Sequence, residues 1–80
     1  GVKKMKFDYL NVYKNGDISV GHICSSSFDL AKSKIRKLSP LVPSLIAVYS
    51  LHGCNTSIKL AAFLYDDFSY LELIWESENV

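Results

Sequence analysis

Residues 13–18 read Tyr-Lys-Asn-Gly-Asp-Ile (YKNGDI), and alternating apolar and polar residues flank this stretch on both sides. An Asn-Gly pair tolerates the positive φ angles of a two-residue hairpin turn, so the stretch predicts a β-hairpin. Closing the hairpin at this pair sets Tyr13 opposite Ile18 and Tyr9 opposite His22. One face of the hairpin then carries Met5, Phe7, Tyr9, Tyr13, Ile18, Val20, His22 and Cys24.

A helix is predicted next, within the stretch SSSFDLAKSKIRKLSP at residues 25–40. Ser26 followed by Asp29 resembles a capping box, and Pro40 ends the helix. Apolar side chains at helical spacing form one stripe: Phe28, Ala31, Ile35 and Leu38. Cations occupy much of the remaining surface: Lys32, Lys34, Arg36 and Lys37. We therefore expect one short amphipathic helix with a basic exposed face.

Three further strands complete the predicted sheet. The stretch SLIAVYSL, residues 44–51, is apolar at almost every position, which is typical of a central strand buried on both faces. Residues 56–65 and 68–76 then predict a second hairpin that turns at Asp66 and Asp67. A helix over Ser57–Tyr65 is the alternative, because Ala61 and Ala62 favour it. In the last strand, one face carries Leu71, Leu73 and Trp75, and the other carries Tyr70 and Ile74.

The predicted order is β-β-α-β-β-β in a single domain of residues 1–80. This is an α+β fold with an antiparallel-rich sheet of about five strands and one helix packed on one face. A helix of about three turns cannot cover five strands that lie about 4.8 Å apart. Apolar side chains should therefore stay exposed, either Leu10, Val12 and Ile23 or Tyr70 and Ile74. We predict self-association, as a homodimer, with Tyr70, Ile74 and Trp75 at the contact.

The two His and two Cys residues of the chain form two His-x-Cys pairs, His22 with Cys24 and His52 with Cys54. A single helix between the second and third strands makes those strands parallel, so the pairs could converge if the strands are neighbours. A Cys₂His₂ zinc site and a Cys24–Cys54 disulfide are the alternatives that this convergence would allow. The spacing lacks the tight knuckle of structural zinc sites. We therefore expect no metal and no cofactor, only a half-buried His and free thiols.

The net charge of +1 is distributed unevenly. Residues 1–40 carry eight Lys or Arg against three Asp or Glu, which gives +5, and residues 41–80 carry one Lys against five acidic residues, which gives −4. The two halves either neutralise each other across the fold or form two patches of opposite sign. Patches of this kind would steer charged partners toward the protein.

Catalytic motifs are absent from the sequence. There is no Gly-rich phosphate loop, no Walker motif and no paired Cys-x-x-Cys. A His and a Cys two residues apart on a strand stand about 6.6 Å apart, too far for a nucleophile and its base. We therefore expect no enzymatic activity and no catalytic residue. The longest apolar runs are too short to span a bilayer, and no secretory leader opens the given sequence, so we expect no membrane association and a cytoplasmic location.

The layout of a hairpin, one short helix opening with SSSFDLAKSKI and a β-meander resembles that of small phage-encoded counter-defence proteins, the anti-CRISPR inhibitors among them. The likeness spans most of the chain but contains no diagnostic residues, so no residue role is carried over. It implies a viral protein that works in the host cytoplasm without a pocket or a motif. Such a protein would cover a protein surface or a nucleic-acid path.

These observations lead to one main hypothesis and two alternatives. The main hypothesis is a small non-enzymatic binding protein that inhibits a larger nucleic-acid-handling complex by surface occlusion. Its partner-binding residues would be Lys32, Lys34, Arg36, Lys37, Asp66, Asp67, Glu72 and Glu76. One alternative is a direct nucleic-acid-binding protein that uses the basic helix, with weak and unspecific binding. The other alternative is a small zinc-stabilised interaction domain.

Overall fold

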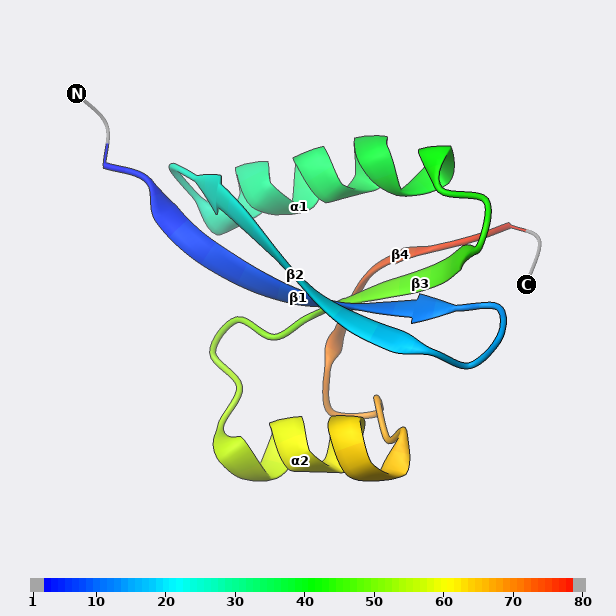
Figure 1. Ribbon diagram of the computed structural model, residues 1–80. Coiled ribbons are helices and arrows are strands. Elements are labelled where there is room, and N and C mark those ends of the chain that lie inside the picture. The colour runs from blue at the N-terminus through cyan, green and yellow to red at the C-terminus, as the bar shows by residue number, and fades with distance from the viewer. Residues whose placement is uncertain (1–2, 79–80) are drawn as a thin grey trace.

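The computed structural model describes residues 3–78, and Figure 1 shows how their helices and strands are arranged. The elements in chain order are β1 (Met5–Tyr13), β2 (Ile18–Ser25), α1 (Phe28–Leu38), the short 3₁₀ helix η1 (Ser39–Leu41), β3 (Leu45–Ser50), α2 (Thr56–Tyr65) and β4 (Glu72–Glu76). The strands form one open sheet in the order β2-β1-β3-β4, and every neighbouring pair is antiparallel. The α+β class is confirmed. The predicted five strands and one helix are corrected to four strands and two helices within residues 3–78.

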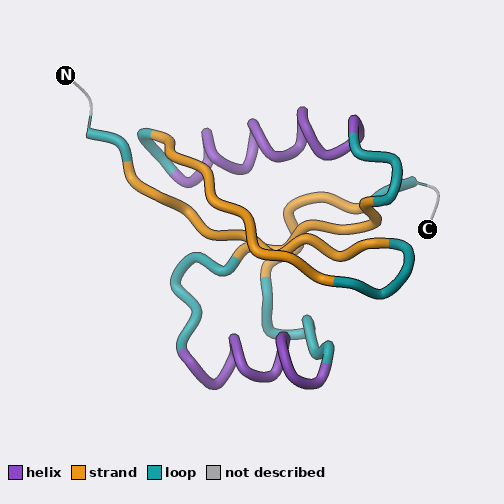
Figure 2. The backbone as a smooth tube through the Cα atoms, in the orientation of Figure 1, coloured by secondary structure: helices purple, strands orange, loops and turns teal. Residues whose placement is uncertain are grey.

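The two helices lie on opposite faces of the sheet, which forms the middle layer of the fold (Figures 1 and 2). One apolar cluster packs on the α1 side, around Ile35, Leu45, Val48 and Ile74. A second cluster packs on the α2 side, around Leu10, Leu51, Ala62 and Leu71. The sheet therefore buries apolar side chains on both of its faces.

The turn between β1 and β2 is longer than the Asn-Gly pair alone indicated. The carbonyl oxygen of Tyr13 accepts a hydrogen bond from the Gly16 N–H, and the Tyr13 N–H donates to the carbonyl oxygen of Asp17, both at 2.9 Å. Gly16 has a φ of 89°, which a residue with a side chain rarely adopts. These features define a three-residue loop with a G1 bulge, in which a type I turn precedes the left-handed glycine.

The bulge shifts the hairpin register by one residue from the prediction. Tyr9 lies opposite Gly21, and His22 lies opposite Asp8. Because side chains alternate between the faces of a strand, a shift of one residue moves every side chain of β2 to the other face. The prediction that His22 and Cys24 share a face with Tyr9 is therefore wrong.

Helix α1 begins one residue later than the capping-box pattern indicated. Ser27, not Ser26, is the N-cap residue, and its side chain accepts a hydrogen bond from the backbone N–H three residues further on. Ala31 and Ile35 are buried, as the apolar stripe predicted. Leu38 in the last turn is 58% exposed, so the stripe does not pack along its full length.

Strand β3 lies in the interior of the sheet, between β1 and β4, which confirms the predicted central strand. Val48 and Ala47 are buried on opposite faces of it. Pro40 lies in η1, directly after the end of α1, as predicted. Strands β2 and β3 both run antiparallel to β1, so they are parallel to each other as predicted, but β1 separates them.

Residues 56–65 form helix α2, so the strand predicted for this stretch is wrong and the alternative helix is confirmed. The Asn55 side-chain oxygen accepts a hydrogen bond from the Ile58 N–H at 3.0 Å and caps the N-terminus. At the other end, Asp66 adopts a left-handed φ of 52°, and the N–H groups of Asp66 and Asp67 both donate to the Ala61 carbonyl oxygen. The two Asp residues therefore end a helix and do not turn a hairpin.

Much of the apolar surface that was predicted to stay exposed is buried, because α2 covers one face of the sheet and a register shift in β4 turns Ile74 toward α1. Leu10 is 0% exposed and Val12 is 9% exposed. The register between β3 and β4 shifts at a bulge, and Ile74 is buried in the cluster beneath α1. The prediction of exposed surface is wrong for these three residues and holds for Tyr70, which is 68% exposed. The same shift pairs Leu73 with Tyr49 and Trp75 with Val48, so Leu73 and Trp75 do not share a face as predicted.

Candidate protein-binding surface

Helix α2 is apolar around most of its circumference but buries little of it. Ala62 is the residue of α2 that is fully buried against the sheet. Leu60 and Leu64 are four residues apart and lie on the side of the helix that faces away from Ala62, and Phe63, three residues after Leu60, lies on the adjoining flank. Leu60, Phe63 and Leu64 are 48%, 37% and 65% exposed. The outer side of α2 thus presents a row of large apolar side chains to solvent.

The exposed apolar residues continue beyond α2 into the following loop and β4. Tyr65, Tyr70 and Leu73 are also exposed. We call the whole set the α2–β4 apolar surface: Leu60, Phe63, Leu64, Tyr65, Tyr70 and Leu73. The loop that carries part of it is held to the sheet, because the Phe68 ring stacks on Tyr49 with a centroid distance of 5.2 Å. Extended apolar surfaces of this kind mark interaction sites on soluble proteins.

The outer row of α2 is not apparent when residues 56–65 are interpreted as a strand. The spacing of Leu60, Phe63 and Leu64 and the capping residue Asn55 were the available signals. Of the three residues predicted at a self-association contact, Tyr70 is exposed and Trp75 is partly buried. Ile74 is only 5% exposed, so its placement at a contact is wrong.

The charged residues that follow α2 in the chain are acidic, and α2 itself carries Lys59. After Lys59 the chain contains no Lys or Arg, and its charged residues are Asp66, Asp67, Glu72, Glu76 and Glu78. Asp66 and Glu76, both predicted to bind a partner, are exposed. The hydroxyl and the backbone N–H of Ser69 donate hydrogen bonds to the Asp67 carboxylate, and these bonds hold the pKa of Asp67 below its ordinary value.

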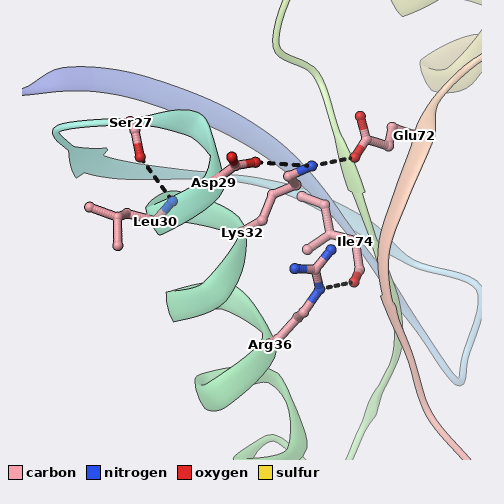
Figure 3. Close-up of polar contacts among 7 residues, drawn as sticks. All are labelled: Ser27, Asp29, Leu30, Lys32, Arg36, Glu72 and Ile74. Carbon is pink, nitrogen blue, oxygen red and sulfur yellow. Dashed lines mark hydrogen bonds and ion pairs between the residues drawn. The ribbon is translucent and has the colours of Figure 1, made fainter.

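Two of the four cations of α1 point toward β4 and contact it, as Figure 3 shows. The Lys32 ammonium lies 2.9 Å from Glu72 and 4.6 Å from the centre of the Phe28 ring, and its side chain is only 17% exposed. The Arg36 Nε donates a hydrogen bond to the carbonyl oxygen of Ile74 at 3.0 Å. These contacts hold α1 against β4. They also engage the Glu72 carboxylate in an ion pair within the protein.

The remaining two cations of the predicted basic face, Lys34 and Lys37, are exposed. They lie on the flank of α1 opposite the one that carries Lys32 and Arg36, by the 100° rotation per residue of an α-helix. Of the four cations expected on the exposed helix face, Lys34, Arg36 and Lys37 are exposed, whereas Lys32 is mostly buried and Arg36 is also bonded to the β4 backbone.

The two His-x-Cys pairs do not converge, because β1 lies between β2 and β3. Cys24 and Cys54 are free thiols. The His52 ring packs against Phe7 and Phe28, with centroid distances of 4.9 and 4.8 Å. In the part of the chain that the structure describes, no three His, Cys, Asp or Glu side chains gather where they could hold a metal ion.

His22, on the outer strand β2, contacts an acidic side chain of the neighbouring strand. Its Nδ1 lies 2.7 Å from the Asp8 carboxylate on β1. The hydrogen bond from His22 lowers the pKa of Asp8, the positive charges of His22, Lys6 and Lys59 lower it further, and partial desolvation opposes them. The net result is a pKa of Asp8 below the ordinary value for Asp.

We predict that the hydrogen bond between His22 and the Asp8 carboxylate contributes to stability above about pH 4 and that the contribution is lost at lower pH. The folded pKa of Asp8 is depressed, so the stabilisation is fully present above the unfolded pKa of about 3.9 and disappears as the pH falls through the folded pKa. The side chains are 53% and 41% exposed, so the contribution is about 0.2–1 kcal/mol. An NMR titration of the Asp8 carboxyl group measures the pKa, and His22→Ala should raise it. An unchanged pKa in that variant would contradict the assignment.

A pocket of about 150 Å³ lies between the C-terminal half of α1 and the sheet. Its lining residues are Tyr9, Asn11, Tyr13, Ile23, Ile35, Leu38, Ser39, Val42 and Leu45. The Tyr13 hydroxyl and the Asn11 amide both hydrogen-bond the Ser19 hydroxyl, at 2.9 and 3.2 Å. The pocket is smaller than the clefts of about 300–1,000 Å³ that hold small-molecule ligands.

Comparisons with protein-family models, with curated proteins and with solved structures found no match to this chain. Neither helix within residues 3–78 has the length and apolarity needed to cross a membrane. Function is therefore inferred from the surface geometry of this chain.

Proposed function

We propose that this chain is a small non-enzymatic binding protein that acts in the cytoplasm and inhibits a larger nucleic-acid-handling complex by covering part of its surface. The α2–β4 apolar surface is the contact region. The observation that carries the proposal is the row of Leu60, Phe63 and Leu64 on α2, which stays 48%, 37% and 65% exposed.

Hydrophobic burial supplies the free energy for this contact. Burying apolar surface contributes roughly 25 cal/mol per Å², and a large apolar side chain taken fully out of water contributes about 1.5–3 kcal/mol. An amphipathic helix that inserts such a row into an apolar groove is a common mode of protein recognition. Helix α2 presents its row at the i, i+3 and i+4 spacing that this mode uses.

Charge indicates the kind of protein that would supply the groove. Every charged residue from Asp66 onward in the sequence is acidic, so a groove bordered by Lys and Arg would complement this surface. Proteins that handle nucleic acids carry basic surfaces of this kind. Two copies of the α2–β4 apolar surface would instead bring acidic residues together.

Direct nucleic-acid binding through α1 is the weaker alternative. Lys34 and Lys37 are the cations of the predicted basic face that make no contact with β4. Two phosphate contacts give a log–log salt slope of only about −1.8, which is typical of weak and unspecific binding. The zinc-stabilised alternative lacks support, because the His-x-Cys pairs are separated by β1.

The proposal is tested with a Leu60→Gln/Leu64→Gln double variant, since Gln keeps the helix propensity of α2 and removes its apolar row. The control is Lys34→Gln/Lys37→Gln, on the other side of the sheet. Each protein is immobilised and exposed to a nuclease-treated bacterial lysate. Bound proteins are identified by mass spectrometry, purified and tested for affinity by calorimetry.

We expect a protein from a nucleic-acid-handling complex that binds the unmodified chain and the lysine variant alike. The leucine variant should lose about 2 kcal/mol or more of binding free energy, which is roughly a 30-fold loss of affinity. The activity of that complex on its nucleic-acid substrate should fall when the unmodified chain is added. A purified partner that binds the leucine variant equally well, or that has no role in nucleic-acid handling, would overturn the proposal.

A further inference from the structure

Strand β2 forms a free edge of the sheet and carries none of the features that usually protect such an edge. It has eight residues with the sequence ISVGHICS, which contains no Lys, Arg, Asp, Glu or Pro. Its pairing with β1 runs without a shift from Ser25 to Ile18. A long, regular and uncharged edge strand is a template for pairing with another strand.

The other edge of the same sheet is protected. Strand β4 has five residues, Glu72 and Glu76 stand at its two ends, and its pairing with β3 is interrupted by a bulge. Short length, charged residues and bulges are the usual means by which a protein blocks edge-to-edge pairing. The contrast between the two edges indicates that β2 is the edge available for a partner strand.

The backbone of β2 offers a full set of hydrogen-bonding groups on its outer side. The carbonyl oxygen of Asp8 accepts from the Leu51 N–H, so the even-numbered residues of β1 bond toward β3 and the odd-numbered residues bond toward β2. Their partners on β2 are Ser19, Gly21 and Ile23. The backbone N–H and C=O groups that point outward therefore belong to Ile18, Val20, His22 and Cys24.

The side chains of β2 are also open to a partner. Val20, His22 and Cys24 lie on the α2 side of the sheet, and all three are exposed. Neither apolar cluster of the fold includes them. Gly21, at the centre of the strand, has no side chain that would hold a neighbouring strand away.

We propose that β2 pairs antiparallel with β2 of a second copy of this chain, about a two-fold axis at Gly21, to form a continuous eight-stranded sheet. In this register Val20 of one copy lies opposite His22 of the other, and Ile18 lies opposite Cys24. The strands contain no Lys, Arg, Asp or Glu, and the two-fold axis sets each His22 opposite Val20 and not opposite the other His22, so no like charges oppose each other along the pairing.

The distribution of charge around β2 favours a second copy in this antiparallel orientation. Asp17 precedes β2 at one end, and Lys6 lies beside Cys24 at the other end, so the two-fold axis sets the Asp17 end of each strand beside the Lys6 end of the other and keeps like charges apart. Helix α1 has Asp29 in its first turn and Lys37 in its last turn. Asp29 lies 3.8 Å from the Lys32 ammonium, on the flank that faces β4, so at α1 it is the opposed helix dipoles that favour the antiparallel orientation. Lys34, near the middle of α1, meets only a solvent-screened like charge.

This inference is independent of the α2–β4 apolar surface and uses a different edge of the sheet. Pairing over residues 18–24 makes a small interface, so we expect a dimer that forms as the concentration rises through the micromolar range. Sedimentation velocity over that range is the first test. Val20→Pro removes one outward N–H without breaking a bond to β1, and should weaken the dimer at least tenfold. Val20→Thr keeps the N–H and the branched shape, and should dimerise like the unmodified chain.

Disulfide trapping tests the register directly. In a Cys54→Ser background, Ile18→Cys should form an intermolecular disulfide with Cys24 of the second copy, because opposed residues on paired strands lie within the Cα distance that a disulfide spans. Oxidised glutathione serves as the oxidant and is reduced to two thiols. Cys54→Ser alone and Leu73→Cys on the β4 edge are the controls, and neither should give a disulfide to Cys24 of the second copy.

The proposal fails if the unmodified chain stays monomeric throughout the range, or if a folded Val20→Pro variant dimerises normally. Circular dichroism shows whether Val20→Pro is folded, and the trapping result decides if it is not. If a monomeric chain instead binds a strand of a different protein, and Val20→Pro blocks this binding, the partner of β2 is that protein and not a second copy. If the Leu60→Gln/Leu64→Gln variant loses its binding partner but still dimerises, the pairing of β2 with a second copy stands independently of the α2–β4 apolar surface.

Discussion

Replacing Leu10 with alanine is expected to lower the free energy of unfolding by about 2–5 kcal/mol. Leu10 is completely buried, and it packs with Leu51, Ala62 and Leu71. These three residues come from the end of β3, from α2 and from the segment before β4. Truncating Leu10 therefore opens a cavity at the point where α2 is fastened to the sheet. Because domains are stable by only about 5–15 kcal/mol, the loss is a large share of the total.

Leu64→Ala is the matched control for this prediction, because it makes the same truncation at a residue that is 65% exposed. Its effect on stability should stay within about 0.5 kcal/mol. Urea unfolding followed by circular dichroism, with all proteins at one low concentration, measures both variants. Equal losses in the two variants would show that Leu10 does not anchor α2.

Replacing Gly21 with valine is expected to cost about 1–3 kcal/mol of stability. The Tyr9 ring lies across β2 at this point, and a Cβ atom at position 21 would overlap the ring. Valine favours strands, but the whole range of strand propensities spans only about 1 kcal/mol. The steric overlap with the Tyr9 ring therefore outweighs this preference, and the substitution lowers the stability. The Tyr9 ring must then move, and Tyr9 also lines the pocket beneath α1.

A double-mutant cycle isolates the cause of this cost. Gly21→Val should be far less destabilising in a Tyr9→Ala background, with a coupling free energy of about 0.5–3 kcal/mol between the two sites. The same urea measurement at low protein concentration keeps dimerisation out of the comparison. If Gly21→Val costs the same in both backgrounds, the Tyr9 ring is not the reason for a glycine at this position.

Signals that act within a few neighbouring residues could be interpreted correctly from the sequence. The Asn15-Gly16 pair marked a hairpin, because few other dipeptides tolerate a positive φ there. Pro40 marked the end of α1, because proline has no N–H to donate. The apolar run at Leu45–Ser50 marked an interior strand, since both of its faces had to be covered. Each of these features depends on local stereochemistry or on composition alone.

Two features needed the tertiary structure because local alternatives differ little in free energy. The turn at Gly16 accommodates a two-residue loop or a bulged three-residue loop, and only packing of β1 between β2 and β3 selects the register. Residues 56–65 are apolar at both strand and helix spacing. The caps at Asn55 and Asp66 and the burial of Ala62 against the sheet select the helix.

The candidate site follows the same division. Composition alone determined that the C-terminal half is acidic and that the basic residues gather before Pro40. Only the fold decided that Lys32 and Arg36 contact β4 while Leu60 and Leu64 face solvent. The physical reason is that charge and polarity belong to each residue, whereas exposure depends on which elements pack together. Packing between residues far apart in the chain is set by the whole sheet and its two helices.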